Sequence, residues 1–531
     1  MNIKIILLVQ MLFVSLIASA DTQFKQSIGF PDASAEFLSG CETPDSGYVF
    51  LGNTTDTVSK ISKLFLVKMD LQGTLLWSKT YEYTIDAFGI KVAAAANGEI
   101  VMMGYTFFDS IPYDDIFLIR TQSDGTILWS KSYGGNDIDE GNDMIIDAQG
   151  NIVIAGYTYS FGSALKSGYA LKTDGNGVFL WSKTYSQNVS QEFNGISQTN
   201  DNGYILSGYT QVPPGINFDG YMIKTDSAGG INWSKRTGGS LSEILYKGWQ
   251  DSAGDYYFSG SASTNTLSAN QDGWLLKVNS LGTNNLINYT YGTSIAERTY
   301  SLAFNATGSS LILSGYSLSS SGYENALYLP LNPNDGTLTG TPLFAGTATG
   351  NARALSSFYS TTGLIQAGYI FTSTDSLGSA YAVKYATNTS PCQVGIASLD
   401  IVNQNSSFLY TDSAGSNEAL ASPTTTNISF ITNSSNPGQN VFCLFSSTSE
   451  AESRESILLF PNPAMQMLTV EIPFEQLAHI CIVDFNGKIV MNTTALSSKI
   501  NLAISDLHSG VYQLVVESGN KLLRKKFIKI D

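Results

Sequence analysis

Short runs of alternating apolar and polar residues fill most of the chain and predict an all-β protein. Between residues 191 and 237, for example, the alternation predicts strands at about 193–199, 204–210, 220–225 and 231–237. The segments between them contain Asp and Gly, as in Asp201-Asn202-Gly203, and suit tight turns because Gly accepts a positive φ. We therefore expect four antiparallel strands in this stretch.

The four-strand pattern recurs along residues 21–390. A glycine lies near the end of the second predicted strand of each unit, and successive glycines are 52 residues apart four times, then 55 and 53 residues apart. These glycines are Gly52, Gly104, Gly156, Gly208, Gly260, Gly315 and Gly368. A Trp-Ser-Lys phrase has the same 52-residue interval, and we expect its tryptophans to pack between units: Trp77, Trp129, Trp181 and Trp233. Seven units of four strands predict a seven-bladed β-propeller.

The two ends of the repeat region complement each other. The seventh unit ends near Lys384 without a Trp-Ser-Lys strand, whereas residues 24–30 resemble the segment that begins at Trp77. The N-terminal strand should therefore complete the last blade. This overlap favours a closed propeller over an open solenoid, whose ends would need caps.

The units resemble the seven-bladed β-propeller repeats found in secreted bacterial proteins. The phrases G-x-x-x-x-x-G-Y-T, K-T-D-x-x-G-x-x-x-W-S-K and Y-G-G carry this resemblance, which implies a propeller fold and a binding platform. Units five and six depart from it, with Asn288 and Leu343-Phe344 near the expected Trp-Ser-Lys.

Residues 456–531 form a separate predicted β-sandwich domain. A Pro-Asn-Pro-Ala phrase at 461–464 opens it, an Asn-Gly-Lys hairpin follows at 486–488, and Leu507 begins an L-x-x-G-x-Y phrase before a basic last strand. This order resembles the C-terminal sorting domain of the type IX secretion system of Bacteroidetes. The resemblance implies the type IX secretion machinery as a partner, and a secreted protein or one at the outer-membrane cell surface.

Residues 1–20 are predicted to be a Sec signal peptide. Lys4 precedes an apolar run at 5–17, and Ala18-Ser19-Ala20 forms a cleavage site, so we expect cleavage between Ala20 and Asp21 and passage through the periplasm. The alternative is a membrane anchor, for which the run is short. No other segment has about 18 apolar residues, so we expect no transmembrane segment in the mature chain.

Residues 391–455 are rich in Ser, Thr and Asn and are predicted to form a linker module. Cys392 and Cys443 lie near its ends. Because the exported chain meets an oxidising environment, we predict a disulfide between them.

The charge balance excludes a nucleic-acid partner. The chain has 44 acidic and 28 basic residues, a net charge of −16, and only two histidines. No motif of a hydrolase nucleophile, a metalloprotease or a phosphate-binding loop is present, so we assign no catalytic residue and no cofactor except Ca²⁺ as an alternative. The adjacent acids Asp114 and Asp115 suggest a glycosidase only weakly, because adjacent acids in a loop are usually solvated.

An acidic residue near the start of the first strand recurs in six units, where it would ring a central channel: Glu36, Asp86, Glu140, Glu192, Glu243 and Glu297. One interpretation is that each carboxylate binds backbone N–H groups and locks neighbouring blades together. The other is a cation site, with Ca²⁺ at Asp137, Asp139, Glu140 and Asp143.

The loops between the second and third strands differ completely among units, and loops on a rigid scaffold are where binding residues gather. Several carry aromatic residues that suit a glycan or protein ligand, although they could instead fold back on their own blades: Phe107, Phe108, Tyr113, Tyr159, Phe161 and Phe218. We predict an exported platform for binding or adhesion to a glycan or surface protein. The alternatives are a glycoside hydrolase or lyase that uses the channel carboxylates, and a structural component of a surface layer.

Overall fold

The structure is a computed structural model of the 531-residue chain. It describes residues 24–530 except 31, 84–85, 107–113, 187, 216, 264–270, 293–294, 320–321, 341, 346–349, 373–374, 386–399, 404–408, 413–416, 421–423, 428–430, 435–437, 442–457, 461–463, 472–477, 484–488, 496 and 519–520. The chain divides into two compact units, Met1–Ser447 and Thr448–Asp531. The predicted cleavage site at Ala20 and Asp21, and the predicted disulfide of Cys392 and Cys443, lie outside the described residues.

Unit 1 consists of repeated antiparallel sheets of four strands, which we name by their first strands. The β2 sheet contains β2 (Ala33–Glu42), β3 (Tyr48–Asp56), β4 (Ser62–Met69) and β5 (Leu75–Glu82). The β6 sheet contains β6 (Ala87–Ala94), β7 (Ile100–Thr106), β8 (Asp115–Thr121) and β9 (Ile127–Gly134). The β10 sheet contains β10 (Asp139–Ile146), β11 (Ile152–Thr158), β12 (Ser167–Thr173) and β13 (Phe179–Ser186). The β14 sheet contains β14 (Gln191–Gln198), β15 (Tyr204–Gln211), β16 (Phe218–Thr225) and β17 (Ile231–Gly238).

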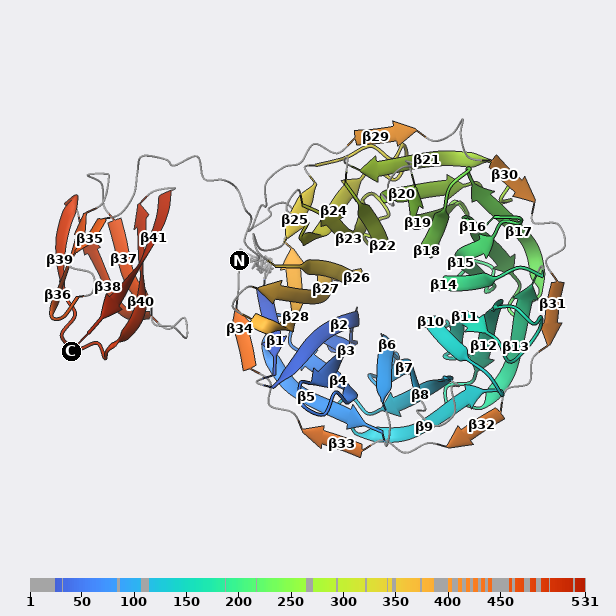
Figure 1. Ribbon diagram of the computed structural model, residues 1–531, viewed down its shortest axis with the longest axis horizontal. Helices are drawn as coiled ribbons and strands as arrows, with labels where there is room; N and C mark the ends of the chain where they lie inside the picture. The colour runs from blue at the N-terminus through green and yellow to red at the C-terminus, as the bar shows by residue number, and fades with distance from the viewer. Residues whose placement is uncertain are drawn as a thin grey trace, which may run out of the picture. The chain divides into compact units, whose positions relative to one another are not determined.

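Three further sheets continue this series. The β18 sheet contains β18 (Glu243–Gln250), β19 (Tyr256–Ser263), β20 (Gln271–Val278) and β21 (Asn285–Gly292). The β22 sheet contains β22 (Glu297–Phe304), β23 (Leu311–Leu318), β24 (Glu324–Leu331) and β25 (Leu343–Ala345). The β26 sheet contains β26 (Ala352–Ser360), β27 (Gly363–Thr372), β28 (Asp375–Tyr385) and the N-terminal strand β1 (Phe24–Gly29). The first strands lie innermost, and the sheets are arranged around them (Figure 1).

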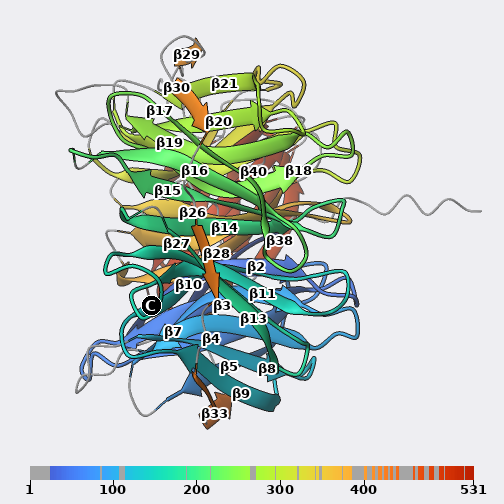
Figure 2. The same ribbon diagram turned by 90° about the vertical axis from the view of Figure 1, so that its right-hand side faces the viewer.

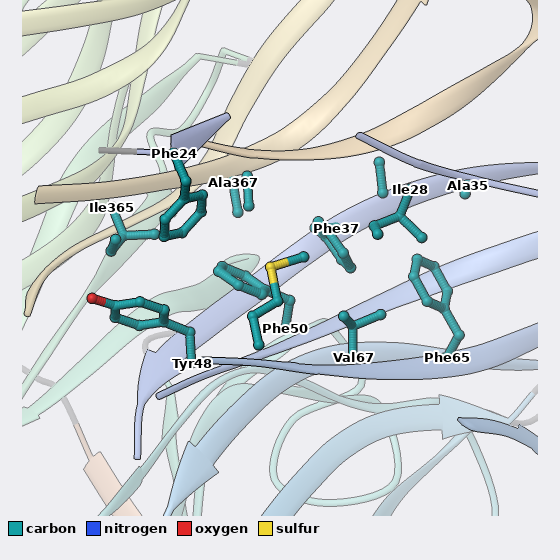
Figure 3. Close-up of a cluster of buried hydrophobic side chains, with 13 residues drawn as sticks. Phe24, Ile28, Ala35, Phe37, Tyr48, Phe50, Phe65, Val67, Ile365 and Ala367 are labelled. Carbon is teal, nitrogen blue, oxygen red and sulfur yellow. The ribbon is translucent and has the colours of Figure 1, made fainter. Parts of the chain in front are cut away.

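The N-terminal strand connects the two ends of the series. β1 pairs antiparallel with β28, with Phe24 opposite Lys384. Phe24 and Ile28 are buried in one apolar cluster with side chains of the β2 sheet, including Tyr48, and of the β26 sheet, including Ile365 (Figure 3). The hydrophobic contact between the first and last sheets therefore depends on the N-terminal segment.

Residues 400–441 add a fifth strand to the outer edge of most sheets. These belt strands meet the sheets in an order opposite to the chain: β29 (Asp400–Asn403) pairs with β21, β30 (Leu409–Asp412) with β17, β31 (Asn417–Leu420) with β13, β32 (Thr424–Asn427) with β9, β33 (Ile431–Ser434) with β5, and β34 (Gly438–Val441) with β1. The belt strand β33 lies outside β5 in both views (Figures 1 and 2). Such pairing satisfies N–H and C=O groups that an edge strand otherwise exposes.

At four junctions, a repeated contact fastens one sheet to the next. The hydroxyl of Tyr133 at the end of β9 donates to Gly177 O in a turn of the β10 sheet at 2.7 Å, and a side chain at Gly177 would collide with Trp129. Gly177 has a φ of +69°, so both its conformation and its closeness to Trp129 favour glycine. The same hydroxyl-to-carbonyl contact joins Tyr81 to Gly125, Tyr185 to Gly229 and Tyr291 to Gly336.

Unit 2 consists of two sheets around their own apolar core. One contains β35 (Leu458–Phe460), β36 (Met467–Glu471) and β39 (Lys499–Ala503), and the other contains β38 (Ile489–Ala495), β37 (Ala478–Val483), β40 (Gly510–Ser518) and β41 (Lys521–Lys529). Tyr512 of the L-x-x-G-x-Y phrase lies in this core and stacks on Phe527. Among the residues described in both units, no helix is long and apolar enough to cross a membrane.

Candidate functional site

A β-bulge in every first strand of unit 1 shapes a central cavity. The strand register shifts by one residue at the same point in each first strand, as between Gly141 and Asp143 of β10. A bulge re-aims the side chain of the extra residue. All of these bulge residues line a cavity of about 440 Å³: Leu38, Ile90, Asn142, Asn194, Tyr246, Tyr300 and Leu355.

Three charged side chains from different sheets meet in this cavity. Asp143, which is 3% exposed, forms an ion pair with Lys91 Nζ at 2.9 Å through Oδ1 and another with Lys247 through Oδ2. Burial acts to raise the pKa of Asp143, but the two ammonium groups hold it at about 2. Burial lowers the pKa of Lys247. The free-energy cost of keeping this ammonium group charged therefore offsets part of the stabilisation that the ion pair provides.

The position of Lys247 depends on a glycine in the neighbouring strand. Lys247 Nζ donates to Ile196 O at 2.8 Å, and Ile196 N donates to Asp143 Oδ2 at 3.0 Å. A Cβ atom at Gly195 would come within 2.2 Å of Tyr246 O. Glycine at this position therefore lets β18 approach β14 closely enough for the ion pair to form.

The four residues predicted to bind Ca²⁺ do not come together as a metal centre. Asp139 accepts from Gly135 N and the Ser160 hydroxyl, Asp137 accepts from the adjacent Ile138 N, and Asp143 belongs to the lysine cluster. No group of three acidic, His or Cys side chains suited to a metal occurs in the part of the chain that the structure describes. The geometry gives no support for a Ca²⁺ site, and we do not propose one.

The six acids predicted to ring the channel occupy three register positions rather than one. Glu36, Glu140 and Glu192 are opposite residues of the second strand at equivalent places. Glu243 and Glu297 come one position earlier, and Asp86 two positions earlier. Asp86 accepts from Ser62 N and Glu243 from Gly239 N, which is the locking role that the sequence suggested as one interpretation.

One register position next to the cavity carries Glu in three sheets, Arg in two, and Phe and Ile in one sheet each. It lies two residues before the bulge residue, and we call its occupants the rim residues: Glu36, Phe88, Glu140, Glu192, Ile244, Arg298 and Arg353. The cross-strand partners are mostly tyrosines: Asn53, Tyr105, Tyr157, Tyr209, Ser261, Tyr316 and Tyr369. Sequence reasoning missed these tyrosines, although the recurrent Gly-Tyr-Thr phrase contains several of them.

The rim residue of one sheet contacts the sheet before it, as the β14 sheet illustrates. Glu192 binds Lys166 Nζ at 2.7 Å and accepts from the Tyr209 hydroxyl at 2.6 Å. Asn142 Nδ2 donates to the other carboxylate oxygen at 3.0 Å. The Lys166 ammonium also lies 4.0 Å from the centre of the Tyr157 ring, so this cluster combines a satisfied ion pair with aromatic surface.

The β26 sheet repeats this arrangement with the charges exchanged. Arg353 forms a two-point ion pair with Glu324, the first residue of β24, through Nε and Nη2. Its guanidinium lies 4.6 Å from the centre of the Tyr316 ring.

The β10 sheet instead brings two acids together. Burial raises the pKa of both Asp114 and Glu140, and the charge of Asp114 raises the pKa of Glu140 further. Burial, together with Asp139 and Asp114, raises the pKa of the neighbouring Asp115 to about 6. The rim is therefore acidic on this side and carries arginines in the β22 and β26 sheets.

The described aromatic residues among the predicted ligand contacts divide into two groups. Phe161 stacks on Tyr169 and packs against its own core, so it folds back on its blade. Tyr159 is 39% exposed and lies edge-on to Tyr157. Phe218 lies edge-on to Tyr209 with ring centres 4.7 Å apart. Phe107, Phe108 and Tyr113 lie outside the described residues.

Residues 458–530 match the family described as the secretion system C-terminal sorting domain. Such a tail implies export to the cell surface or secretion, with recognition by the type IX secretion machinery. No curated protein matches the chain.

Several solved structures resemble the chain at low identity. The β-propeller domain of the Trilobed protease from Pyrococcus furiosus has 8% identity and a TM-score of 0.40, covering 66% of this chain and 93% of that one. Sqt1 from Chaetomium thermophilum has 10% identity and a TM-score of 0.35, covering 68% and 98%. PorZ of Porphyromonas gingivalis, a surface component of the type IX secretion system, has 9% identity and a TM-score of 0.19, covering 96% and 100%. These TM-scores are below 0.5, so none of the three decides the function of this chain.

Proposed function

We propose that this chain is an exported surface or extracellular protein in which residues 24–385 form a closed seven-bladed β-propeller that binds a glycan or a surface protein. The pairing of β1 with β28 and the apolar cluster shared by the β2 and β26 sheets support closure of the ring. The sorting domain supports delivery to the outside of the cell. A Sec signal peptide at residues 1–20 would start this route.

The observation that carries a binding function is the chemical variety of the rim residues. Their scaffold is constant, because each occupies the same register position two residues before a bulge. A role in holding the fold would favour the same residue from sheet to sheet, as in the four sheets where a tyrosine donates to a turn glycine. Here carboxylates, arginines and apolar side chains occupy this position in different sheets beside one cavity, which is typical of a surface adapted to a specific ligand.

The shape of the site favours a glycan over a protein ligand. The cavity of about 440 Å³ falls within the range of small-molecule sites, and tyrosines such as Tyr246 and Tyr300 line it. Aromatic faces pack well against sugar rings.

The carboxylates at the rim do not favour a glycoside hydrolase. The two acids of a retaining glycosidase stand about 5 Å apart and those of an inverting enzyme farther apart. Asp114 and Glu140 are instead neighbouring acids whose pKa values are both raised by burial, and Glu192 is held by Lys166 and Tyr209.

A glycan array probed with the mature full-length protein tests the proposal. We expect binding to a restricted set of glycans without a hydrolysis product. Alanine at Tyr157 or Tyr209 should weaken that binding at least tenfold, because an aromatic anchor contributes about 2 kcal/mol or more.

Asp226→Asn provides the matched control. The Asp226 carboxylate accepts from backbone N–H groups of the exposed turn between β16 and β17, and Asp226 is not a rim residue. The variant should bind as the wild type does. Loss of binding in Asp226→Asn but not in the tyrosine variants would place the site on the hairpins and contradict the proposal.

A further inference from the structure

Two rim arginines stand in equivalent places, and among the described residues only Arg353 forms an ion pair with a carboxylate. Arg353 of the β26 sheet is neutralised by Glu324, which begins β24 of the preceding sheet. Arg298 of the β22 sheet faces the β18 sheet, where the equivalent strand β20 begins with Gln271. Register confirms this equivalence, because Glu324 pairs with Leu318 and Gln271 with Ser263, each at the end of a second strand.

Arg298 therefore lacks the carboxylate that Arg353 has. It forms no ion pair with any carboxylate in the described parts of the chain, and its Nε is buried without a hydrogen-bond partner there. The two neighbouring stretches outside the described residues, 264–270 and 293–294, contain no Asp or Glu in the sequence. A half-buried guanidinium without a counter-ion is unfavourable in the free protein, and a bound anion would relieve that cost.

Tyrosines surround this arginine and connect it to the cavity. Arg298 interacts with Tyr316, Tyr246 and Tyr300, and hydrogen bonds with Tyr300. The rings of Tyr246 and Tyr300 meet edge to face with their centres 5.1 Å apart, and both line the cavity. A ligand group that reaches Arg298 would thus also contact two aromatic side chains.

We propose that Arg298 is the anion-binding group of a subsite for a carboxylate-bearing sugar, such as a uronic acid unit of an acidic glycan. The ligand carboxylate takes the place at Arg298 that Glu324 has at Arg353, and the sugar ring packs against Tyr246 and Tyr300. This inference rests on the proposed glycan-binding function and specifies the ligand class.

Chemistry and size both favour a sugar acid. The planar guanidinium fork matches a planar carboxylate, as the two-point contact between Arg353 and Glu324 shows within this protein. The cavity that adjoins the anion subsite, about 440 Å³, has the size of a small-molecule site.

The test compares acidic and neutral glycans on one array, followed by titration of the mature full-length protein with a matched pair. Methyl glucuronide and methyl glucoside suit this purpose because they differ only at C6. We expect the wild type to prefer acidic glycans by at least tenfold, and Arg298→Gln to remove that preference.

Gln271→Glu provides an independent second variant. It recreates at Arg298 the ion pair that Glu324 makes with Arg353, so it should block the acidic ligand and raise the thermal unfolding midpoint. This variant keeps the proposal testable if Arg298→Gln fails to fold. Arg236→Gln is the control, because Arg236 is already paired with Asp219 and should keep the wild-type preference.

The possible results distinguish a failure of the Arg298 subsite from a failure of the proposed glycan-binding function. The subsite is refuted if the wild type binds acidic and neutral glycans equally, or if both Arg298→Gln and Gln271→Glu keep the preference for acidic glycans. Neither result contradicts the proposed glycan-binding function. Selection of an acidic peptide over every uronate overturns the ligand class. Failure of the wild type to bind any glycan or protein overturns the proposed function itself.

Discussion

Replacing Asp143 with alanine should be among the most destabilising single changes in unit 1. The substitution removes ion pairs to Lys91 and Lys247 and the hydrogen bond from Ile196 N, and it leaves two ammonium groups facing each other at a buried position. Removing one partner of a buried ion pair costs about 3–5 kcal/mol, because the remaining charge keeps its desolvation penalty. We expect a loss of that size in the free energy of unfolding of unit 1.

The pH dependence gives a second measure of the same interaction. The pKa of Asp143 is about 2 in the folded protein and 3.8 for the free side chain. A carboxyl whose pKa is lowered by folding stabilises the protein above its unfolded pKa, and this contribution disappears as the pH falls through the folded value. The difference corresponds to about 2 kcal/mol, which the wild type should lose between about pH 5 and pH 2. Asp143→Ala should lack this part of the acid destabilisation.

Tryptophan fluorescence during urea unfolding is the appropriate assay. All six tryptophans of the chain precede residue 275, so the signal reports unit 1 and not unit 2. Glu82→Gln serves as the control, because its ion pair with Lys63 is about one-third exposed on both sides and should contribute less than about 1 kcal/mol. A loss below about 1 kcal/mol for Asp143→Ala, or an unchanged acid profile, would refute the reasoning.

Three further predictions concern the ends of the chain. Deleting Phe24–Gly29 should destabilise unit 1 by about 3–6 kcal/mol, because Phe24 and Ile28 are buried and each buried side chain of this size contributes about 1.5–3 kcal/mol; an unchanged melting temperature would argue against ring closure. Serine at both Cys392 and Cys443 should lower the stability of the oxidised protein by up to about 4 kcal/mol, as expected for a loop of about 50 residues, and detection of two free thiols at these positions in the wild type would exclude the disulfide. Deleting residues 522–531 removes nearly all of β41 and its pairing with β40, so the protein should remain in the periplasm, and normal surface delivery would contradict this.

Local patterns in the sequence were sufficient to predict the strands. Alternation with a period of two and turns that contain glycine depend only on residues that are close in the chain. They predicted an all-β chain with four strands per repeat, and the described sheets of unit 1 have this form. The sorting domain could be recognised in the same way, because its phrases occur in a fixed order over a short segment, and the family match at 458–530 supports it.

The rim could not be assigned from spacing alone. The distance in sequence between a rim residue and the repeated glycine of the second strand differs among the units. Glu36 and Glu192 precede their glycines by 16 residues, Arg298 precedes its glycine by 17 and Arg353 by 15. Hairpin length differs among the units, so equal offsets do not mark equal positions. Because side chains alternate between faces, a shift of one residue moves an acid such as Glu243 to the other side of its strand.

Contacts between distant repeats were decided only by the tertiary structure. Lys91, Asp143 and Lys247 belong to three different units and meet because the bulged first strands converge on one cavity and Gly195 leaves room between two of them. The belt at residues 400–441 was predicted as a linker because four-residue segments show little alternation of their own. Its strands form where the outer edges of the sheets offer unpaired backbone groups. The sequence by itself therefore determined the strands, the turns and the sorting domain, which depend on neighbouring residues. The ion cluster, the rim and the belt required the packed arrangement that brings remote residues together.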